Sequence, residues 1–224
     1  MHVGRIMRKD LVTIPPDTSL IKARDIIKEK LIEHLLVVDK DGKLVGIVSD
    51  RDVKQTWASP ATTLSAHELN YLLKQLTVDT IMVKKIISVT PGTTIERAGR
   101  IMQDNRISAL PVMEHGKLVG IITTTDVMGV LLEAIGVNGE SARFVVLVED
   151  RIGMIAEVSR ILKEEQINIR SLVTWPEKAY PGVYHFVLRV GAANGAKAIA
   201  ALTGAGFKVL TEYVDDLSPY LPGQ

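Results

Sequence analysis

Two short segments of the sequence combine residue types that could hold a nucleotide. Gly46 to Asp52 reads Gly-Ile-Val-Ser-Asp-Arg-Asp, and Gly120 to Asp126 reads Gly-Ile-Ile-Thr-Thr-Thr-Asp. Each segment is expected to open a helix, whose free amides and hydroxyl suit a phosphate. The carboxylate three residues after the hydroxyl could accept hydrogen bonds from both hydroxyls of a ribose. The glycine would allow a close approach of the backbone.

The same spacing also has a purely structural explanation. Ser-x-x-Asp and Thr-x-x-Asp form capping boxes, in which the two side chains satisfy amides at the start of a helix. Capping is the commoner role of a single pattern of this kind. Because the pattern occurs twice, each time three residues after a glycine, we favour ligand binding.

The two segments belong to an internal repeat. With an offset of 75 residues Ile6-Met7 falls on Ile81-Met82, and after a one-residue deletion Gly42 to Ile47 is identical to Gly116 to Ile121. A six-residue identity in register indicates a duplication. Each copy of about 50 residues is too small to bury a sufficient core alone, so the two copies should pack on each other.

Each copy is predicted to contain strand, helix, strand, strand and helix. The first strands, Val12 to Ile14 and Ile87 to Val89, stop at prolines. The first helix of each copy begins at Thr18 or Ser19, or at the matching residues of the second copy. Apolar residues recur in it at helical spacing, namely Leu20, Ala23, Ile26 and Ile27 in the first copy and Ile95, Ala98, Ile101 and Met102 in the second. The hairpins run from Leu35 to Ser49 and from Leu110 to Thr123, turning at Asp41-Gly42 and His115-Gly116.

Two further regions complete the chain. Between the copies, Ser65 to Leu76 has the spacing of an N-capped amphipathic helix. After a linker at 136–141, the order βαββαβ predicts a ferredoxin-like unit. Its strands are expected at 144–148, 167–175, 183–190 and 207–213, and its helices at 154–165 and 192–205, the first with Ile155, Val158, Ile161 and Leu162 on one face. The fold class is therefore α+β.

Composition and missing motifs exclude several functions. The 27 basic and 26 acidic residues give a net charge of +1, which makes nucleic acid an unsuitable main partner. No cysteine is present, which excludes disulfides and thiolate catalysis and fits a reducing cytoplasm. Met1 to Asp10 is no secretory signal, and Asp126 and Glu133 interrupt the longest apolar stretch, so no membrane partner is expected. The five histidines lack metal-ligand spacing and no catalytic motif is found, which predicts no metal, no obligatory cofactor and no enzyme activity.

Residues 4–56 and 78–134 resemble two CBS motifs. Leu110-Pro111-Val112 matches the hydrophobic-Pro-Val signature of that family, with Leu36 in place of the proline in the first copy, and the two glycine-to-aspartate segments match its adenosyl-binding signature. The resemblance implies a pseudo-twofold Bateman module that binds AMP, ADP, ATP or S-adenosylmethionine in clefts between the motifs.

The same resemblance implies roles for individual residues. Ser49 and Thr123 would contact phosphate or ribose, Asp52 and Asp126 would hold the ribose hydroxyls, and the backbones of Thr13-Ile14 and Ser88-Val89 would flank the adenine. His34 would lie near the ligand phosphate. The predicted adenosyl-site residues are Thr13, Ile14, His34, Gly46, Ser49, Arg51, Asp52, Ser88, Val89, Gly120, Thr123 and Asp126.

Residues 142–214 resemble an ACT domain, the amino-acid-sensing module of many allosteric enzymes, through Asp150-Arg151-Ile152-Gly153 and Gln166-Ile167-Asn168-Ile169. The resemblance implies that Asp150, Gly153 and Asn168 face an amino-acid ligand. ACT domains also serve purely to dimerise, and both roles stay open at this point.

The whole architecture resembles acetoin-utilisation regulatory proteins of the AcuB type. The predicted boundaries are 1–56 and 78–135 for the CBS motifs, 57–77 for a helical insert, 136–141 for a linker, 142–216 for the ACT domain and 217–224 for a tail. This likeness implies a cytoplasmic homodimer that senses an adenosyl ligand and acts on an unidentified partner protein, in acetoin or central carbon metabolism. The alternatives are an amino-acid sensor acting through the ACT domain and a detached regulatory subunit of a metabolic enzyme or transporter.

The two predicted clefts differ in charge. The first copy carries Arg51 and His34 where the second has Thr125 and Ala109. Charge-assisted contacts are the stronger hydrogen bonds, so the first cleft should prefer phosphorylated ligands and the second should be weaker or take uncharged or sulfonium adenosyl groups. Pseudo-twofold packing that lends a side chain of one copy to the other cleft would change this assignment.

Overall fold

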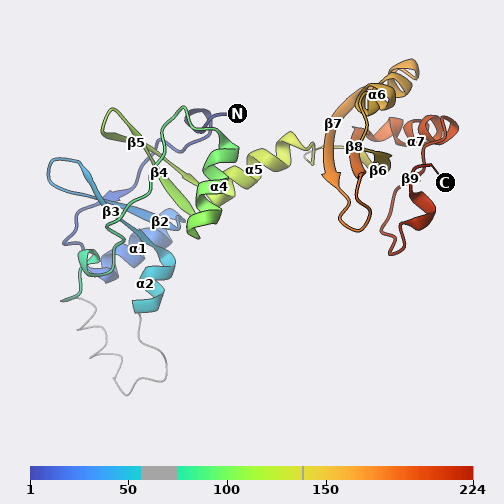
Figure 1. The fold of residues 1–224 in the computed structure, drawn as a ribbon. Coiled ribbons are helices and arrows are strands. Elements are labelled where there is room, and N and C mark those ends of the chain that lie inside the picture. Colours follow the sequence, from blue (N-terminus) through green and yellow to red (C-terminus); the bar gives the residue numbers. More distant parts are fainter. Residues whose placement is uncertain (57–74, 138, 224) are drawn as a thin grey trace. The chain divides into compact units, whose positions relative to one another are not determined.

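The computed structural model describes residues 1–56, 75–137 and 139–223, with helices and strands labelled as in Figure 1. Nearly all of the helix expected from Ser65 to Leu76, and most of the predicted insert with Trp57, lie outside these ranges. The chain forms two compact units, Met1–Val127 and Met128–Gln224. No helix within the described ranges is long and apolar enough to cross a membrane.

The first repeat has the predicted order of elements. It contains β1 (Thr13–Ile14), α1 (Leu20–Lys30), β2 (His34–Val38), β3 (Leu44–Ser49) and α2 (Asp50–Thr56). Ser19 caps α1 by accepting a hydrogen bond from the amide of Lys22, as its position predicts. The sheet order is β1-β2-β3, with β1 parallel to β2 and β3 antiparallel to it.

The second repeat departs from the prediction at its first strand. It contains α4 (Ile95–Asn105), β4 (Ala109–Glu114), β5 (Lys117–Thr123) and α5 (Thr124–Ala134). The strand expected from Ile87 to Val89 is reduced to one parallel bridge between Val89 and Val112. The backbone turns on both sides of this bridge, because Ile86 donates to Lys84 and Thr93 donates to Thr90, which leaves no room for a longer ladder.

The two repeats exchange their leading segments. The short helix η1 (Val3–Arg5) packs on the second repeat, where the amide of Val3 donates to Thr93. The equivalent helix η2 (Val78–Thr80) packs on the first repeat, where the amide of Val78 donates to Thr18. Both valines are completely buried. The expectation that the copies pack on each other is confirmed, although each copy is not self-contained.

Gly46 and Gly120 serve this exchange. A β-carbon on Gly46 would overlap the side chain of Met82, and one on Gly120 would overlap that of Met7. The methionine that precedes the exchanged backbone pairing thus fills the space left by each glycine. The close approach that glycine permits here is therefore one between repeats, in addition to any approach of a ligand.

The second unit has the predicted βαββαβ order with altered ends. Its elements are β6 (Ser141–Glu149), α6 (Met154–Glu164), β7 (Ile169–Pro176), β8 (Val183–Gly191), η3 (Ala192–Asn194), α7 (Gly195–Gly204) and β9 (Val209–Leu210), and the sheet order is β7-β8-β6-β9. β6 starts inside the predicted linker. β9 is much shorter than 207–213, because the amide of Phe207 closes α7 by donating to Leu202. Ile155 is 52% exposed, since Met154 takes the inward position instead.

The C-terminal segment covers the face of the β6–β8 sheet opposite α6 and α7. Val145, Leu147 and Leu210 form a small buried cluster there, distinct from the main core built around Phe144, Val158 and Leu188. Val214, Leu217, Tyr220 and Leu221 pack against this cluster. The predicted tail therefore belongs to the folded unit.

Candidate functional site

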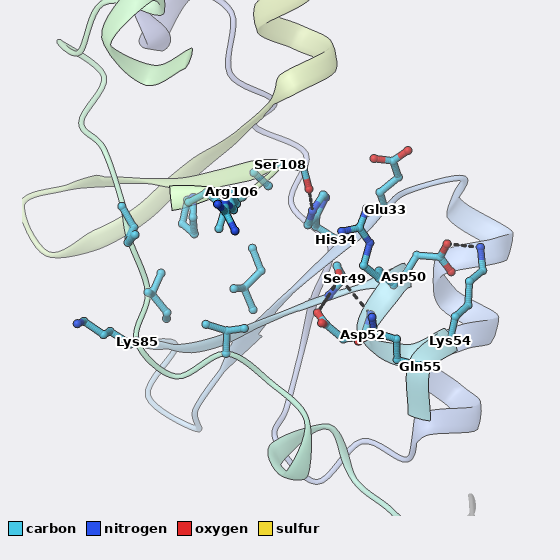
Figure 2. A pocket seen from close by; sticks show the side chains of 18 residues that line it. Glu33, His34, Ser49, Asp50, Asp52, Lys54, Gln55, Lys85, Arg106 and Ser108 are labelled. Carbon is cyan, nitrogen blue, oxygen red and sulfur yellow. Dashed lines mark hydrogen bonds and ion pairs between the residues drawn. The ribbon is translucent and has the colours of Figure 1, made fainter. Parts of the chain in front are cut away.

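A cavity of about 710 Å³ lies between the two repeats of the first unit (Figure 2). Its volume falls in the range of small-molecule sites. We call it the Asp52 cleft. Its lining comes from both repeats and comprises Glu33, His34, Ile47, Ser49, Asp50, Arg51, Asp52, Lys54, Gln55, Val83, Lys85, Ile86, Ile87, Arg106, Ile107, Ser108, Ala109 and Pro111.

Ser49 and Asp52 face this cleft in a reciprocal cap. The amide and hydroxyl of Ser49 donate to Asp52 Oδ2 at 2.8 and 2.6 Å, and the amide of Asp52 donates to Ser49 Oγ at 3.2 Å. The capping explanation is thus real. It uses only one carboxylate oxygen, and Oδ1 of Asp52 accepts no hydrogen bond from the described residues. Capping and ligand binding are therefore compatible, because Oδ1 can still accept a ligand hydroxyl.

His34 lies where the two repeats meet. It pairs with Ser49 across β2 and β3, and its Nε2 lies 2.9 Å from the hydroxyl of Ser108 in the second repeat. Its Nδ1 is buried without a hydrogen-bond partner among the described residues. Burial lowers the pKa of His34, while Glu33 and Asp52 oppose this effect. The neutral imidazole is therefore favoured in the free protein.

Three cationic side chains, besides Lys54, line the Asp52 cleft. Arg51 comes from α2, whereas Lys85 and Arg106 come from the second repeat, and Figure 2 shows Lys85 and Arg106 across the cleft from Asp52. None of these three forms an ion pair within the described residues. Lys54 is paired with Asp50 at 2.5 Å. Arg51, Lys85 and Arg106 can therefore neutralise an anionic group such as a phosphate.

An apolar wall completes the cleft. Aliphatic side chains in the lining come from Ile47, Val83, Ile86, Ile87 and Ile107. Such a wall beside hydrogen-bonding groups suits a flat heterocycle. Ile86 and Ile87 come from the second repeat, immediately before Ser88, so the lining of the Asp52 cleft depends on the other copy.

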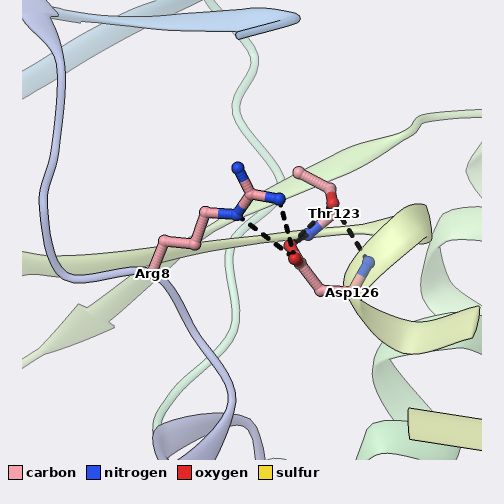
Figure 3. Close-up of polar contacts among 3 residues, drawn as sticks. All are labelled: Arg8, Thr123 and Asp126. Atoms are coloured by element: carbon pink, nitrogen blue, oxygen red, sulfur yellow. Dashed lines mark hydrogen bonds and ion pairs between the residues drawn. The ribbon is translucent and has the colours of Figure 1, made fainter. Parts of the chain in front are cut away.

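The second predicted segment, Gly120 to Asp126, has the same cap, but its aspartate has different neighbours. The amide and hydroxyl of Thr123 donate to Asp126 Oδ2 at 2.9 and 2.6 Å. Nε and Nη2 of Arg8 both donate to Asp126 Oδ1, at 3.2 and 3.1 Å (Figure 3). Neither Thr123 nor Asp126 lines the 710 Å³ cavity. Sequence reasoning missed Arg8, because 118 residues separate it from Asp126 and only the exchange of leading segments brings them together.

The other predicted adenosyl-site residues lie outside the cleft lining. Thr13 and Ser88 are exposed, and Ile14 and Val89 are buried in the core or against it. Gly46 and Gly120 contact the exchanged methionines, as described above. The predicted difference in positive charge between the two clefts also needs correction. It compared only residues at matching positions of the two repeats, and so it did not include Arg8, which places a cation beside Asp126. Besides Arg8, the functional candidates that the sequence did not reveal are Lys85, Ile86, Ile87, Arg106 and Ser108.

The residues predicted to bind an amino acid do not converge on a cavity. Asp150, Gly153 and Asn168 are all exposed. A cavity of about 240 Å³ is lined by Leu147, Val148, Glu149, Arg151, Met154, Glu157, Ala205, Gly206, Phe207, Lys208, Tyr220, Leu221, Pro222 and Gly223. It lies at the end of the sheet that carries Asp150 and Gly153, whereas Asn168 lies at the opposite end, because β7 begins opposite Val190 and β6 ends opposite Val183. None of the three predicted residues is in this lining. In the described parts of the chain no group of three or more acidic or histidine side chains could hold a metal ion.

Comparison with known proteins gives two domain matches. A CBS domain model matches residues 3–58 and 78–133, together half of the chain, and an ACT domain model matches residues 142–202. A CBS domain-containing protein from Dictyostelium discoideum is 30% identical over 134 residues, which are 59% of this chain and 92% of that protein. A homoserine O-acetyltransferase from Methanosalsum zhilinae is 36% identical over 126 residues, which are 56% of this chain and 23% of the enzyme. The chain thus spans less than a quarter of that enzyme's length.

Two solved structures are similar to part of the chain. A CBS-domain containing protein from Agrobacterium tumefaciens is 27% identical, with a TM-score of 0.52, over 58% of this chain and 99% of its own. A protein assigned to acetoin utilization, AcuB from Vibrio cholerae, is 28% identical, with a TM-score of 0.49, over 59% of this chain and 91% of its own.

Proposed function

This chain belongs to the CBS domain family and ends in an ACT domain, as its sequence predicted, and we propose that it senses an adenosyl ligand in the Asp52 cleft. CBS and ACT domains are regulatory modules, so the bound state would be transmitted to a partner protein. The observation that carries the proposal is the cleft itself, which combines an apolar wall with a cap and three cations. Among the described residues, Oδ1 of Asp52 accepts no hydrogen bond and the three cations form no ion pair.

The arrangement favours a phosphorylated adenosyl ligand. The ribose hydroxyls would donate to Asp52, the adenine would lie against Ile86 and Ile87, and the phosphate would meet Arg51, Lys85 or Arg106. A neutral His34 beside that phosphate would gain a proton on binding, since an anion raises the pKa of a nearby imidazole.

A ligand screen tests this proposal directly. Purified full-length protein is mixed with AMP, ADP, ATP, S-adenosylmethionine, adenosine and the common amino acids, and its melting temperature is measured. The proposal expects the nucleotides to raise the melting temperature, and the rise should grow with the logarithm of ligand concentration once the site is saturated. Stabilisation by an amino acid alone would support the alternative, in which the protein senses an amino acid through the ACT domain. A melting temperature that stays unchanged with every adenosyl compound would refute the proposal.

The remaining parts of the proposed role concern activity, assembly and context. We propose a protein without catalytic activity of its own, and steady ATP turnover that disappears in the Asp52→Ala/Asp126→Ala double variant would refute this. The AcuB-type resemblance supports acetoin or central carbon metabolism as the context, and the lack of cysteine supports a cytoplasmic setting. A detached regulatory subunit would instead copurify with one metabolic enzyme or transporter.

We also propose a homodimer. β7 is an edge strand of eight residues whose Trp175 is 60% exposed, and long exposed edges commonly pair with another chain. Light scattering should then give twice the chain mass of 24.5 kDa. A single-chain mass across micromolar concentrations would contradict it.

A further inference from the structure

The repeat places two different side chains at equivalent backbone positions. Arg8 pairs with Ile121 through hydrogen bonds of 2.9 and 3.0 Å, and Val83 pairs with Ile47 through hydrogen bonds of 2.9 and 3.2 Å. Arg8 follows Met7, which fills the space beside Gly120, and Val83 follows Met82, which fills the space beside Gly46. The same six-residue spacing separates Gly120 from Asp126 and Gly46 from Asp52. The backbones are thus matched, and the side chains are not.

This difference decides what each aspartate can accept. Asp126 Oδ2 is occupied by Thr123, and Oδ1 is occupied by two donors of Arg8. At the equivalent place in the Asp52 cleft, the aliphatic Val83 cannot donate a side-chain hydrogen bond, and Asp52 Oδ1 is free of described partners. The side chain of Asp126 is 13% exposed, whereas the side chain of Arg8 is 54% exposed, so Arg8 can leave the pair toward solvent.

We propose that Arg8 closes the second adenosyl site, so that ligand occupies the Asp52 cleft first and reaches Asp126 only by displacing the guanidinium. The inference rests on the proposed function and assigns Arg8 as the residue that sets the order of occupancy. The sequence comparison attributed a weaker second site to a lack of cations. Here the second site is weaker because a cation of the chain, Arg8, already holds the carboxylate of Asp126.

Calorimetric titration with AMP tests the closure in both directions. In the Asp52→Ala background, Arg8→Val should tighten binding at Asp126 by about fivefold, the factor that corresponds to the upper range of a partly exposed ion pair. In the Asp126→Ala background, Val83→Arg should weaken binding in the Asp52 cleft by a similar factor. Arg8→Gln, which keeps a polar side chain, is the second variant if Arg8→Val folds poorly. No change in either background, or weaker binding after Arg8→Val, would overturn the proposal.

A measurement without ligand separates this inference from the proposed function. Carboxyl groups of the free protein are modified with a water-soluble carbodiimide and an amine, and the modified residues are quantified by mass spectrometry. Asp126 should react more slowly than Asp52 in the wild type, and Arg8→Val should remove that protection. Equal reactivity in the wild type would refute the closure. If the protection is present but AMP binds no variant, the proposed adenosyl function fails while the Arg8 contact stands.

Discussion

Replacing Asp52 and Asp126 one at a time separates ligand binding from helix capping. The two residues make the same cap, with amide bonds of 2.8 and 2.9 Å and hydroxyl bonds of 2.6 Å in both repeats. Asp52→Ala and Asp126→Ala should therefore each destabilise the protein by about 1 kcal/mol, the usual scale of a capping interaction, and Asp126→Ala also loses the ion pair with Arg8. Of the two, Asp52→Ala should cause the larger loss of AMP affinity, because Oδ1 of Asp52 has no partner among the described residues, whereas Arg8 occupies Oδ1 of Asp126.

The loss of affinity can be estimated from the contacts that Asp52 would make. A hydrogen bond to a charged group contributes about 1.5 to 3 kcal/mol, which is about tenfold to a hundredfold in affinity. Asp52→Asn refines the test, since its amide oxygen can still accept from the backbone of Ser49 while its negative charge is gone. This variant should keep most of the stability and lose most of the affinity.

The assay is calorimetric titration of AMP into the wild type and the three variants, with unfolding in urea measured on the same samples. Similar affinity losses for Asp52→Ala and Asp126→Ala would show that the second site is open and contributes equally. Unchanged affinity in Asp52→Asn would refute the role of the negative charge, and unchanged affinity in Asp52→Ala would leave capping as the whole explanation of the motif.

Three further results follow from other contacts. Gly46→Ala should destabilise the protein by about 1 to 3 kcal/mol in urea unfolding, because its β-carbon overlaps Met82. Adding Met82→Ala should relieve most of that cost, whereas the control Gly129→Ala, with open space around it, should not destabilise the protein. The lowered pKa of half-buried His34 means that unfolding takes up a proton, so stability should fall as pH drops from about 6.5 toward the folded-state pKa. His34→Asn should flatten this dependence, and an unchanged pH dependence would show that another group causes it. Removing residues 214–224 should increase binding of an apolar dye, because Leu217 and its neighbours cover the β6–β8 face, and unchanged dye binding would contradict that role.

Local signals in the sequence predicted most of the fold correctly. The duplication, the cap at Ser19 and the order of elements in both units are determined by residues close together in the chain. The errors lie at element ends, where tertiary contacts decide. Ile155 fits the helical spacing as well as Met154 does, and only packing against the sheet shows which of them is buried.

Only those residues of the candidate site that lie close together in the sequence could be predicted. Ser49 and Asp52 are three residues apart, so one segment reveals them. Lys85 and Arg106 reach the same cleft from the other repeat, and their position depends on how the two repeats pack. Arg8 shows the limit most clearly, because its role requires the exchange of leading segments, for which the sequence contains no local signal.

The same exchange explains how binding in the Asp52 cleft could act on the rest of the protein. Asp52 belongs to the first repeat, whereas Ile86, Ile87 and Arg106 belong to the second, so one ligand would contact both repeats at once. His34 already joins them through Ser108. A ligand changes a conformational equilibrium only by the difference in its affinity for the two states. A ligand held by one repeat alone would bind every arrangement of the pair equally, whereas a ligand that spans both binds one arrangement best and shifts the pair toward it.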